Sequence, residues 1–541
     1  MIKQPTSSLY PPSPLVIVAV SRLAAILCPL QRLVVSILLL VFALGGVDPV
    51  ACGLAAQEPA GRCEQWDVFE LALLGPSEGN PFTEVKLSAR FTSGGQTLTV
   101  PGFYDGSGLY RIRFSPPAQG EWKYATSSAS AALDGKAGTV IAVAPSGANH
   151  GPVQVQKTFH FAYADGTPWF QVGTTCYVWT HQPAALQEQT LKTLATAPFN
   201  KLRMCIFPKS YTYNANEPAD FPFVRKADGT FDFMRFDPAN WQNLERRIGD
   251  LRKLGIEADI ILFHPYDRWG FAEMDDATDD LYLRYAVARL GAFRNVWWSL
   301  ANEYDFMIPP LRKEQKGNKT VEDFDRFLAI LGKEDAFGRL RGNHHAAKMY
   351  DHRAPLITHA SIQHRDLTQV LAWREKYRKP IVVDECRYEG NIQPSWGKLT
   401  GPEMVHQFWV GTVAGGYVGH GETLRQPDDI LWWSKGGALH GESPARIAFL
   451  RKIMEALPYT EMTPSRPVEN VLILSKPGTA TLAYALKAGP MKLLLAGEKD
   501  YRVEAIDTWN MTVEPLPVAP PGEFTFTAPR SDFLLRITVS K

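Results

Sequence analysis

The chain has 541 residues, of which 45% are hydrophobic and 21% charged, and this composition excludes a disordered or fibrous protein. Its length allows more than one domain, although a single α/β barrel can take about 250 residues. The formal net charge is +1, and so small a charge gives no electrostatic basis for nucleic-acid binding.

The first 56 residues are predicted to form a secretory signal peptide. Basic residues precede an apolar run at residues 33–47, and Ala55 and Ala56 supply small side chains for cleavage. The run is shorter than the about 20 residues that a membrane-spanning helix needs. We therefore expect a secreted or periplasmic protein with no membrane span after processing. An uncleaved membrane anchor, or lipid attachment at Cys52, stays open as an alternative.

Residues 63–147 have the pattern of an Ig-like β-sandwich. Apolar side chains alternate along residues 84–92 and again along residues 109–114, with Gly and Pro between these segments. Short alternating strands with turns at this spacing are typical of two packed antiparallel sheets. The segment 145–152, which begins and ends with Pro, is the predicted linker to the next domain.

Residues 152–457 change to apolar strands that alternate with helical patterns, which predicts a parallel sheet. Residues 241–254 carry an apolar stripe and predict a helix, Gly255 ends it, and residues 256–264 predict a strand. We expect a (β/α)₈ TIM barrel here, with no strand assigned between residues 304 and 354. Residues 465–541 return to short strands and predict a small C-terminal β-sandwich.

Four cysteines follow the predicted signal peptide, namely Cys63, Cys176, Cys205 and Cys386. They are too few for a disulfide framework, and their spacing fits no zinc motif. Cys176 and Cys205 are predicted on neighbouring strands, and whether they pair stays open. We expect no metal and no cofactor.

Two glutamates suggest the chemistry of the barrel. Glu303 and Glu385 each follow a short apolar run, at the carboxyl end of a predicted strand, where parallel barrels carry their active sites. Strand alternation places Glu303 on one face with Ala301 and Ser299, whose small side chains suit a narrow barrel interior. Two carboxyl groups facing each other are the minimal machinery for cleaving a glycosidic bond. The sequence therefore predicts a glycosidase that uses Glu303 and Glu385.

Two motifs resemble those of glycoside hydrolase clan A. Residues 298–305 (WSLANEYD) and 384–390 (DECRYEG) are most similar to the apiosidase-like bacterial hydrolases, which also place β-domains before and after the barrel. The resemblance implies that Glu303, after the fourth strand, is the acid/base, and that Glu385, after the seventh, is the nucleophile. It implies a carbohydrate substrate cleaved with retention of configuration.

The resemblance also implies roles for residues around the pair. Asn302 would bind the sugar 2-hydroxyl, Arg203 would orient the nucleophile, and His264 would line the subsite. A platform for the apolar face of the sugar is expected after the last strand, from Trp432 or Trp433.

Some assignments stay open at the barrel mouth. The clan often places a Tyr or His of the sixth strand against the nucleophile, and His359 and His364 are both candidates. Glu389 is an alternative nucleophile, although it lies beyond the apolar run that ends at Glu385.

Two other classes of function compete with this interpretation. A metal-dependent barrel hydrolase would place a His-x-His pair on the first strand, and residues 170–175 contain none. A non-catalytic carbohydrate-binding protein would also use flanking β-domains and many aromatic residues. Binding alone, however, gives no reason to place two glutamates with Arg203 and Asn302 at one barrel mouth. The sugar, exo or endo cleavage and the oligomeric state do not follow from the sequence.

Overall fold

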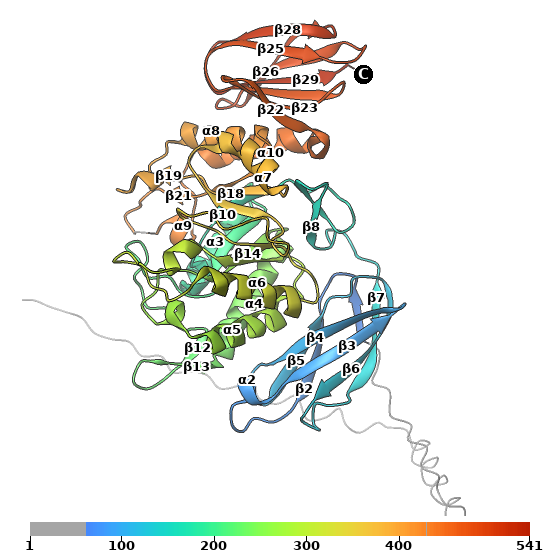
Figure 1. Ribbon diagram of the computed structural model, residues 1–541, viewed down its shortest axis with the longest axis vertical. Helices are drawn as coiled ribbons and strands as arrows, with labels where there is room; N and C mark the ends of the chain where they lie inside the picture. Colours follow the sequence, from blue (N-terminus) through green and yellow to red (C-terminus); the bar gives the residue numbers. More distant parts are fainter. Residues whose placement is uncertain (1–60, 429, 541) are drawn as a thin grey trace, which may run out of the picture. The chain divides into compact units, whose positions relative to one another are not determined.

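The computed structural model describes residues 61–428 and 430–540, so the predicted signal peptide lies outside the described residues. Figure 1 shows the described chain coloured from blue at its N-terminal strands to red at its C-terminal strands. Within this part of the chain, no helix has the length and apolar character needed to cross a membrane.

The N-terminal strands form one seven-stranded sheet in the order β1-β7-β6-β3-β4-β5-β2. All neighbouring strands pair antiparallel except β1 and β7, which pair parallel. Alternating side chains such as Phe91, Phe114 and Trp122 are fully buried and fill the space that the curved sheet encloses. The elements are β1 (Gly61–Glu64), β2 (Phe69–Leu74), α2 (Pro81–Glu84), β3 (Leu87–Ser93), β4 (Gln96–Tyr104), β5 (Leu109–Phe114), β6 (Gly120–Ser128) and β7 (Ala137–Val143).

The middle of the chain forms a nearly closed parallel barrel of eight strands. Their order is β16-β15-β14-β11-β10-β20-β18-β17, so each strand lies beside its neighbour in the barrel sequence. At the seam between β16 and β17, Thr358 N–H donates to the Arg341 carbonyl at 2.9 Å. The strands are β10 (Val172–Thr175), β11 (Lys201–Cys205), β14 (Glu257–Phe263), β15 (Val296–Ala301), β16 (Arg341–Gly342), β17 (Ala360–Gln363), β18 (Ile381–Glu385) and β20 (Tyr417–His420).

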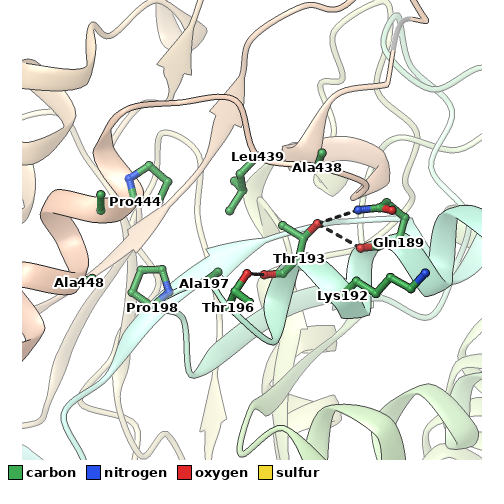
Figure 2. Close-up of a pocket in the computed structure, with 11 residues that line it drawn as sticks. Gln189, Lys192, Thr193, Thr196, Ala197, Pro198, Ala438, Leu439, Pro444 and Ala448 are labelled. Carbon is green, nitrogen blue, oxygen red and sulfur yellow. Dashed lines mark hydrogen bonds between the residues drawn. The ribbon is translucent and has the colours of Figure 1, made fainter.

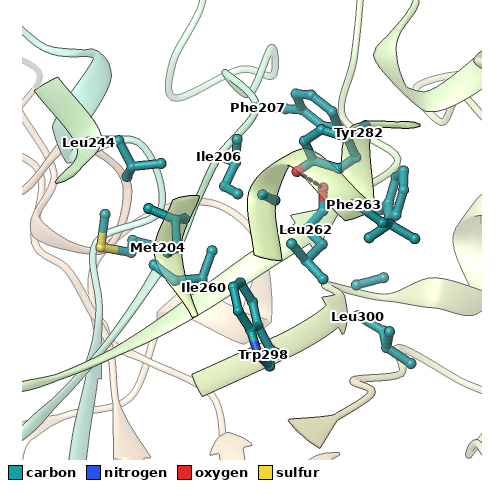
Figure 3. Close-up of a cluster of buried hydrophobic side chains, with 14 of the residues drawn as sticks. Met204, Ile206, Phe207, Leu244, Ile260, Leu262, Phe263, Tyr282, Trp298 and Leu300 are labelled. Atoms are coloured by element: carbon teal, nitrogen blue, oxygen red, sulfur yellow. Dashed lines mark hydrogen bonds between the residues drawn. The ribbon is translucent and has the colours of Figure 1, made fainter. Parts of the chain in front are cut away.

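Helices cover the outside of the barrel, and an apolar layer joins them to the strands. Figure 3 shows part of this layer, where Met204, Ile260 and Trp298 of three neighbouring strands pack with Leu244 of α4 and Tyr282 of α5. The helices are α3 (Ala184–Leu194), α4 (Pro238–Lys253), α5 (Asp276–Leu290), α6 (Val321–Glu334), α7 (Val370–Tyr377), α8 (Gly401–Val413), α9 (Trp432–Lys435) and α10 (Ser443–Glu455).

Three short strand pairs extend the barrel. They are β8 (Val153–Gln156) with β9 (His160–Tyr163), β12 (Phe223–Arg225) with β13 (Phe231–Phe236), and β19 (Glu389–Gly390) with β21 (Glu422–Thr423). The β19 and β21 pair joins the loop after the seventh barrel strand to the loop after the eighth.

The C-terminal strands form a six-stranded antiparallel sheet, β22-β23-β24-β29-β26-β27, and a separate β25-β28 ribbon. Buried side chains of the sheet, including Val471 and Ile537, pack with Met491 and Leu493 of the ribbon. The strands are β22 (Thr463–Val468), β23 (Val471–Lys476), β24 (Ala480–Ala485), β25 (Gly489–Leu495), β26 (Tyr501–Asp507), β27 (Thr512–Ala519), β28 (Gly522–Ala528) and β29 (Phe533–Val539).

The predicted fold class, a (β/α)₈ barrel between two β-domains, is confirmed. All four described cysteines are free thiols, which answers the question left open for Cys176 and Cys205. Although β10 and β11 are neighbours, the two thiols belong to different apolar clusters, Cys176 with Met204 and Cys205 with Ile261.

Candidate active site

Both predicted glutamates lie at the carboxyl end of the barrel strands. Glu385 is the last residue of β18, the seventh strand. Glu303 lies two residues beyond β15, the fourth strand, and begins the short 3₁₀ helix at residues 304–307. Their exposed fractions are only 7% for Glu303 and 4% for Glu385. Glu303 has a φ of 58°, a left-handed conformation that is costly for a glutamate and that accumulates at functional sites.

A chain of hydrogen-bonding groups connects the two carboxyl groups. The phenol oxygen of Tyr177 contacts Glu385 Oε1 and lies 2.9 Å from the amide oxygen of Asn302. The amide nitrogen of Asn302 donates to Glu303 Oε2 at 3.1 Å, and the Tyr266 hydroxyl donates to the same carboxylate. The phenol of Tyr177 has one proton, so it serves either Asn302 or Glu385 at a given moment.

Buried charges lie beneath Glu385. Arg203 Nη1 is 3.5 Å from Glu385 Oε1, and its Nε is 3.6 Å from Asp259 Oδ2. Lys201 Nζ lies between Asp259, at 2.6 Å, and Asp384, at 2.7 Å. Lys201 and Arg203 lie two residues apart on β11 and therefore point to one side. Asp384 and Glu385 are adjacent on β18, at an irregularity in its pairing with β17. The resulting network fixes the Arg203 guanidinium beside Glu385.

Lys209 is a further buried cation beside the pair. Its Nζ lies 3.5 Å from the ring centre of Tyr177 and 4.3 Å from that of Tyr266. Burial lowers the pKa of Lys209, while the charges of nearby groups that include Glu303 and Glu385 act in the opposite direction. The amine is therefore held by aromatic rings at a place where it can offset the charge of the two carboxylates.

The surroundings of Glu303 raise the pKa of its carboxyl group toward neutral pH. Burial, followed by the negative charge of Glu385, raises the pKa of Glu303 to about 7, while Lys209 and Tyr266 act to lower it. A carboxyl group with such a pKa can donate a proton and later accept one.

The other predicted site residues occupy different places. His264 is buried, and its Nε2 lies 3.2 Å from the carbonyl oxygen of Phe207. Trp432 is 1% exposed, with its indole N–H donating to Thr174 Oγ1 at 2.9 Å. Trp433 is more open, and four tyrosine rings surround it with centroids 5.3 to 5.9 Å away, namely Tyr177, Tyr211, Tyr213 and Tyr388.

The histidine beside the pair comes from the fifth strand and not from the sixth. His344 lies two residues after β16. Its Nε2 is 3.9 Å from Glu385 Oε1, and its Nδ1 accepts a hydrogen bond from the Glu303 backbone N–H at 3.3 Å. His359 lies before β17, against Trp297, and His364 donates its backbone N–H to the Glu385 carbonyl. The short β16, with two residues, offers no alternation from which His344 could have been selected.

The carboxylate of Glu389 points toward the start of α10. It accepts hydrogen bonds from the backbone N–H groups of Glu442, at 2.8 Å, and Ser443, at 3.2 Å. These contacts tie Glu389 to the start of α10.

The pocket drawn in Figure 2 lies on the outer helices. Gln189 and Thr193 of α3 line one side of it, and Leu439 and Pro444 line the other. It contains neither of the two glutamates, so its surroundings do not bear on their chemistry.

Comparisons with known proteins place the chain in a family. The apiosidase-like catalytic domain family matches residues 156–461, and two domains of unknown function, DUF5060 and DUF5605, match residues 62–129 and 477–538. A solved structure from Bacteroides vulgatus ATCC 8482, provisionally described as a glycoside hydrolase, is 39% identical with a TM-score of 0.81. The match covers 89% of this chain and 100% of that one.

A second structure from Bacteroides vulgatus ATCC 8482, a family 5 glycoside hydrolase, is 14% identical with a TM-score of 0.58. That match covers 72% of this chain and 94% of the other, and at this identity it supports the fold alone. A search of curated proteins found no match. The chain belongs to the apiosidase-like family, and its barrel is a catalytic domain of the glycoside hydrolase type.

Proposed function

We propose that this protein is a secreted or periplasmic glycosidase that cleaves O-glycosidic bonds with retention of configuration. Glu385 is the nucleophile and Glu303 is the general acid and base. The observation that supports this best is the buried pair of glutamates, connected through Tyr177 and Asn302 at the carboxyl end of the barrel. The apolar run in the first 56 residues supports export.

In the first step, a carboxylate oxygen of Glu385 attacks the anomeric carbon of the bound sugar. The bond from that carbon to the leaving oxygen breaks, and Glu303 gives its proton to this oxygen. The sugar is then held as an ester of Glu385. The pKa of Glu303, about 7, allows a large fraction of this carboxyl group to be protonated at neutral pH.

In the second step, Glu303 takes a proton from a water molecule. The resulting oxygen nucleophile attacks the anomeric carbon, and the ester bond to Glu385 breaks. The second inversion restores the original configuration, and Glu303 is protonated again for the next turnover.

Neighbouring groups assist both steps. Arg203 and Tyr177 offset and orient the negative charge of Glu385, because both lie against its Oε1. Asn302 donates a hydrogen bond to Glu303, and its proposed role is to bind the sugar 2-hydroxyl. Trp433, within its ring of tyrosines, is the better placed of the two tryptophans to pack on the apolar face of a sugar, since Trp432 is buried. His264 lies deeper and supports the wall of the subsite.

A non-catalytic carbohydrate-binding role is the alternative, and turnover distinguishes the two. The test is a screen of the protein against aryl glycosides and polysaccharides, with Glu303→Gln, Glu385→Gln and Glu257→Gln compared with the unchanged chain. Glu257 is a buried glutamate of β14 that hydrogen-bonds Trp297 at 2.9 Å and serves as the matched control.

We expect the unchanged chain and Glu257→Gln to hydrolyse a substrate. Glu303→Gln and Glu385→Gln should each abolish this hydrolysis. Activity that survives in either of the first two variants would remove that glutamate from the mechanism. Sugar binding without any turnover by the unchanged chain would favour the binding role. Unchanged turnover after treatment with a chelator would exclude a catalytic metal.

A further inference from the structure

A second group of buried ionisable side chains lies at the base of the loops that follow β18 and β20. Glu389, His420 and Glu422 have exposed fractions of 4%, 0% and 1%. One carboxylate oxygen from each glutamate and one ring nitrogen of His420 all lie within 4.8 Å of one another. Glu389 and Glu422 are directly paired in the β19 and β21 ladder, which brings residues distant in sequence to one place.

The two carboxylates receive only uncharged hydrogen-bond donors in the described part of the chain. Glu422 accepts from the backbone N–H groups of His440 and Gly441, each at 2.8 Å. Glu389 accepts from the N–H groups of Glu442 and Ser443 and from the Ser443 hydroxyl. These donors fix the orientation of the carboxylates. Glu389 Oε2 accepts two of the hydrogen bonds, and each of the other three oxygens accepts one and keeps a further lone pair. Two buried carboxylates that receive only uncharged donors favour an added positive charge at this place.

His420 provides the independent evidence for a ligand. Its Nδ1 lies 3.1 Å from Thr174 Oγ1, while its Nε2 is buried with no hydrogen-bond partner. With the proton on Nδ1 and donated to Thr174, Nε2 carries the free lone pair. A neutral imidazole whose other nitrogen is held by a hydrogen bond is the usual form of a metal-binding histidine.

We propose that Glu389, His420 and Glu422 bind one divalent cation of the first transition series, with zinc as the representative ion. Two carboxylates with one imidazole are a ligand set that suits such ions, whereas calcium and magnesium prefer oxygen ligands throughout. The sequence gives no zinc motif, because Glu389 is separated by about 30 residues from His420, at the end of β20, and Glu422, in β21, and the ladder between β19 and β21 brings the two segments together.

The proposed cation has a structural role, which is to hold the loops after β18 and β20 together. Glu389 follows Tyr388, whose ring centre lies 5.5 Å from that of Trp433, and Glu422 lies in the loop that leads to Trp433. A cation held by both loops would fix the relative positions of Tyr388 and Trp433 at the barrel mouth. The proposal does not depend on the glycosidase mechanism, because neither proposed catalytic glutamate is a ligand.

The test measures zinc binding to the full chain after removal of metal with a chelator. Zinc bound per chain is determined by inductively coupled plasma mass spectrometry after dialysis, and the melting temperature is followed as zinc is added. The variants are Glu422→Gln, which keeps the shape of the side chain, and His420→Phe, which keeps the ring stacked on Phe199. Glu257→Gln is again the buried control.

We expect the unchanged chain and Glu257→Gln to retain about one zinc ion and to melt at a higher temperature when zinc is present. Glu422→Gln and His420→Phe should bind zinc at least about tenfold more weakly and lose the shift in melting temperature. If the unchanged chain retains no zinc, the proposal is wrong, whatever the folding of the variants. Equal binding by the unchanged chain and either folded variant would also overturn it. Because these measurements need no substrate, they stay informative if no glycosidase activity is found.

Discussion

Lys209 is, after Glu385, the charged residue that most affects the working pH of the proposed acid and base. Its positive charge acts to lower the pKa of Glu303, while burial and the charge of Glu385 raise that pKa to about 7. Since Glu303 must be protonated for the first step, kcat/KM of the unchanged enzyme should fall as the pH rises past about 7.

Lys209→Met should move this alkaline limb to higher pH. Loss of a nearby positive charge favours the neutral form of Glu303, so the carboxyl group keeps its proton to a higher pH. The measurement is the pH dependence of kcat/KM, with Lys192→Met on the exposed face of α3 as the matched control. An alkaline limb that stays in place or moves to lower pH would show that Lys209 does not tune Glu303.

Tyr177→Phe should lower kcat/KM by about 10- to 100-fold, because a hydrogen bond to a charged group contributes about 1.5–3 kcal/mol. The phenol contacts Glu385 and also approaches Asn302, so its loss removes support from the nucleophile. Tyr213→Phe, also beside Trp433, is the control and should change little. Similar losses in both variants would mean that the effect comes from packing of the aromatic wall.

The sequence could identify Glu303 and Glu385 because each follows an apolar strand, and strand ends converge in a barrel. Arg203 lies in the middle of β11, and its role was predicted from the resemblance to clan A and not from a strand end. Lys209 and Tyr266 lie on loops, where no periodicity determines which side chains point toward the centre. Their part in the site therefore becomes visible only when the strands are brought together in space.

At the scale of elements, the barrel strands and helices with long patterns were predictable, and the short ones were not. The predicted helix at residues 241–254 corresponds to α4 (Pro238–Lys253), and the predicted strand at 256–264 to β14. β16 has only two residues, too few for any pattern. The apolar pattern of residues 355–361 also predicts a strand, which overlaps β17 (Ala360–Gln363) by two residues, because the residues before Ala360 form a turn followed by an irregular segment.

The start of helix α6 carries a sequence signal from which this helix could have been predicted. A capping box joins Thr320 and Asp323, and an apolar stripe follows with Phe324, Phe327 and Leu331 buried. This combination predicts a helix start within residues 304–354, the interval in which no strand is predicted. The fifth strand could then have been sought directly after α6.

Two glycine substitutions test how tightly these elements are packed. Gly249→Ala, in the middle of α4 with open space around its added methyl group, should stabilise the protein by about 0.5–1 kcal/mol.

Gly441→Ala should destabilise the protein by about 1–3 kcal/mol, because its Cβ would lie 2.4 Å from Glu389 Oε2 and 2.8 Å from Glu422 Oε2. Urea denaturation measures both free energies of unfolding. A neutral or stabilising effect of Gly441→Ala would contradict the close packing of this loop on the two carboxylates.

At the scale of the whole described chain, a buried ionic network joins the N-terminal sheet to the barrel. Arg113 of β5 and Arg289 of α5 contact the same oxygen of Glu245 in α4, at 2.6 and 2.5 Å. Arg289 also pairs with Asp105 at 2.8 Å. Such a network makes the N-terminal sheet part of the folded unit that contains the barrel.

Glu245→Gln should lower the free energy of unfolding by about 3 kcal/mol, because two buried guanidinium groups lose their shared carboxylate. Glu188→Gln is the control, since Glu188 pairs with Arg247 from a side chain that is 58% exposed. Denaturant unfolding of both variants provides the comparison. If Glu245→Gln costs no more than Glu188→Gln, the network does not hold the two parts of the chain together.

The central claim is that Glu385 is the nucleophile, and azide rescue of Glu385→Ala tests it most directly. The variant is incubated with an active aryl glycoside and sodium azide, and the configuration of the glycosyl azide is determined by nuclear magnetic resonance. We expect azide to restore part of the turnover and to yield a glycosyl azide of inverted configuration, because azide attacks in place of the missing carboxylate. A glycosyl azide of retained configuration would contradict this assignment and make residue 385 the acid and base.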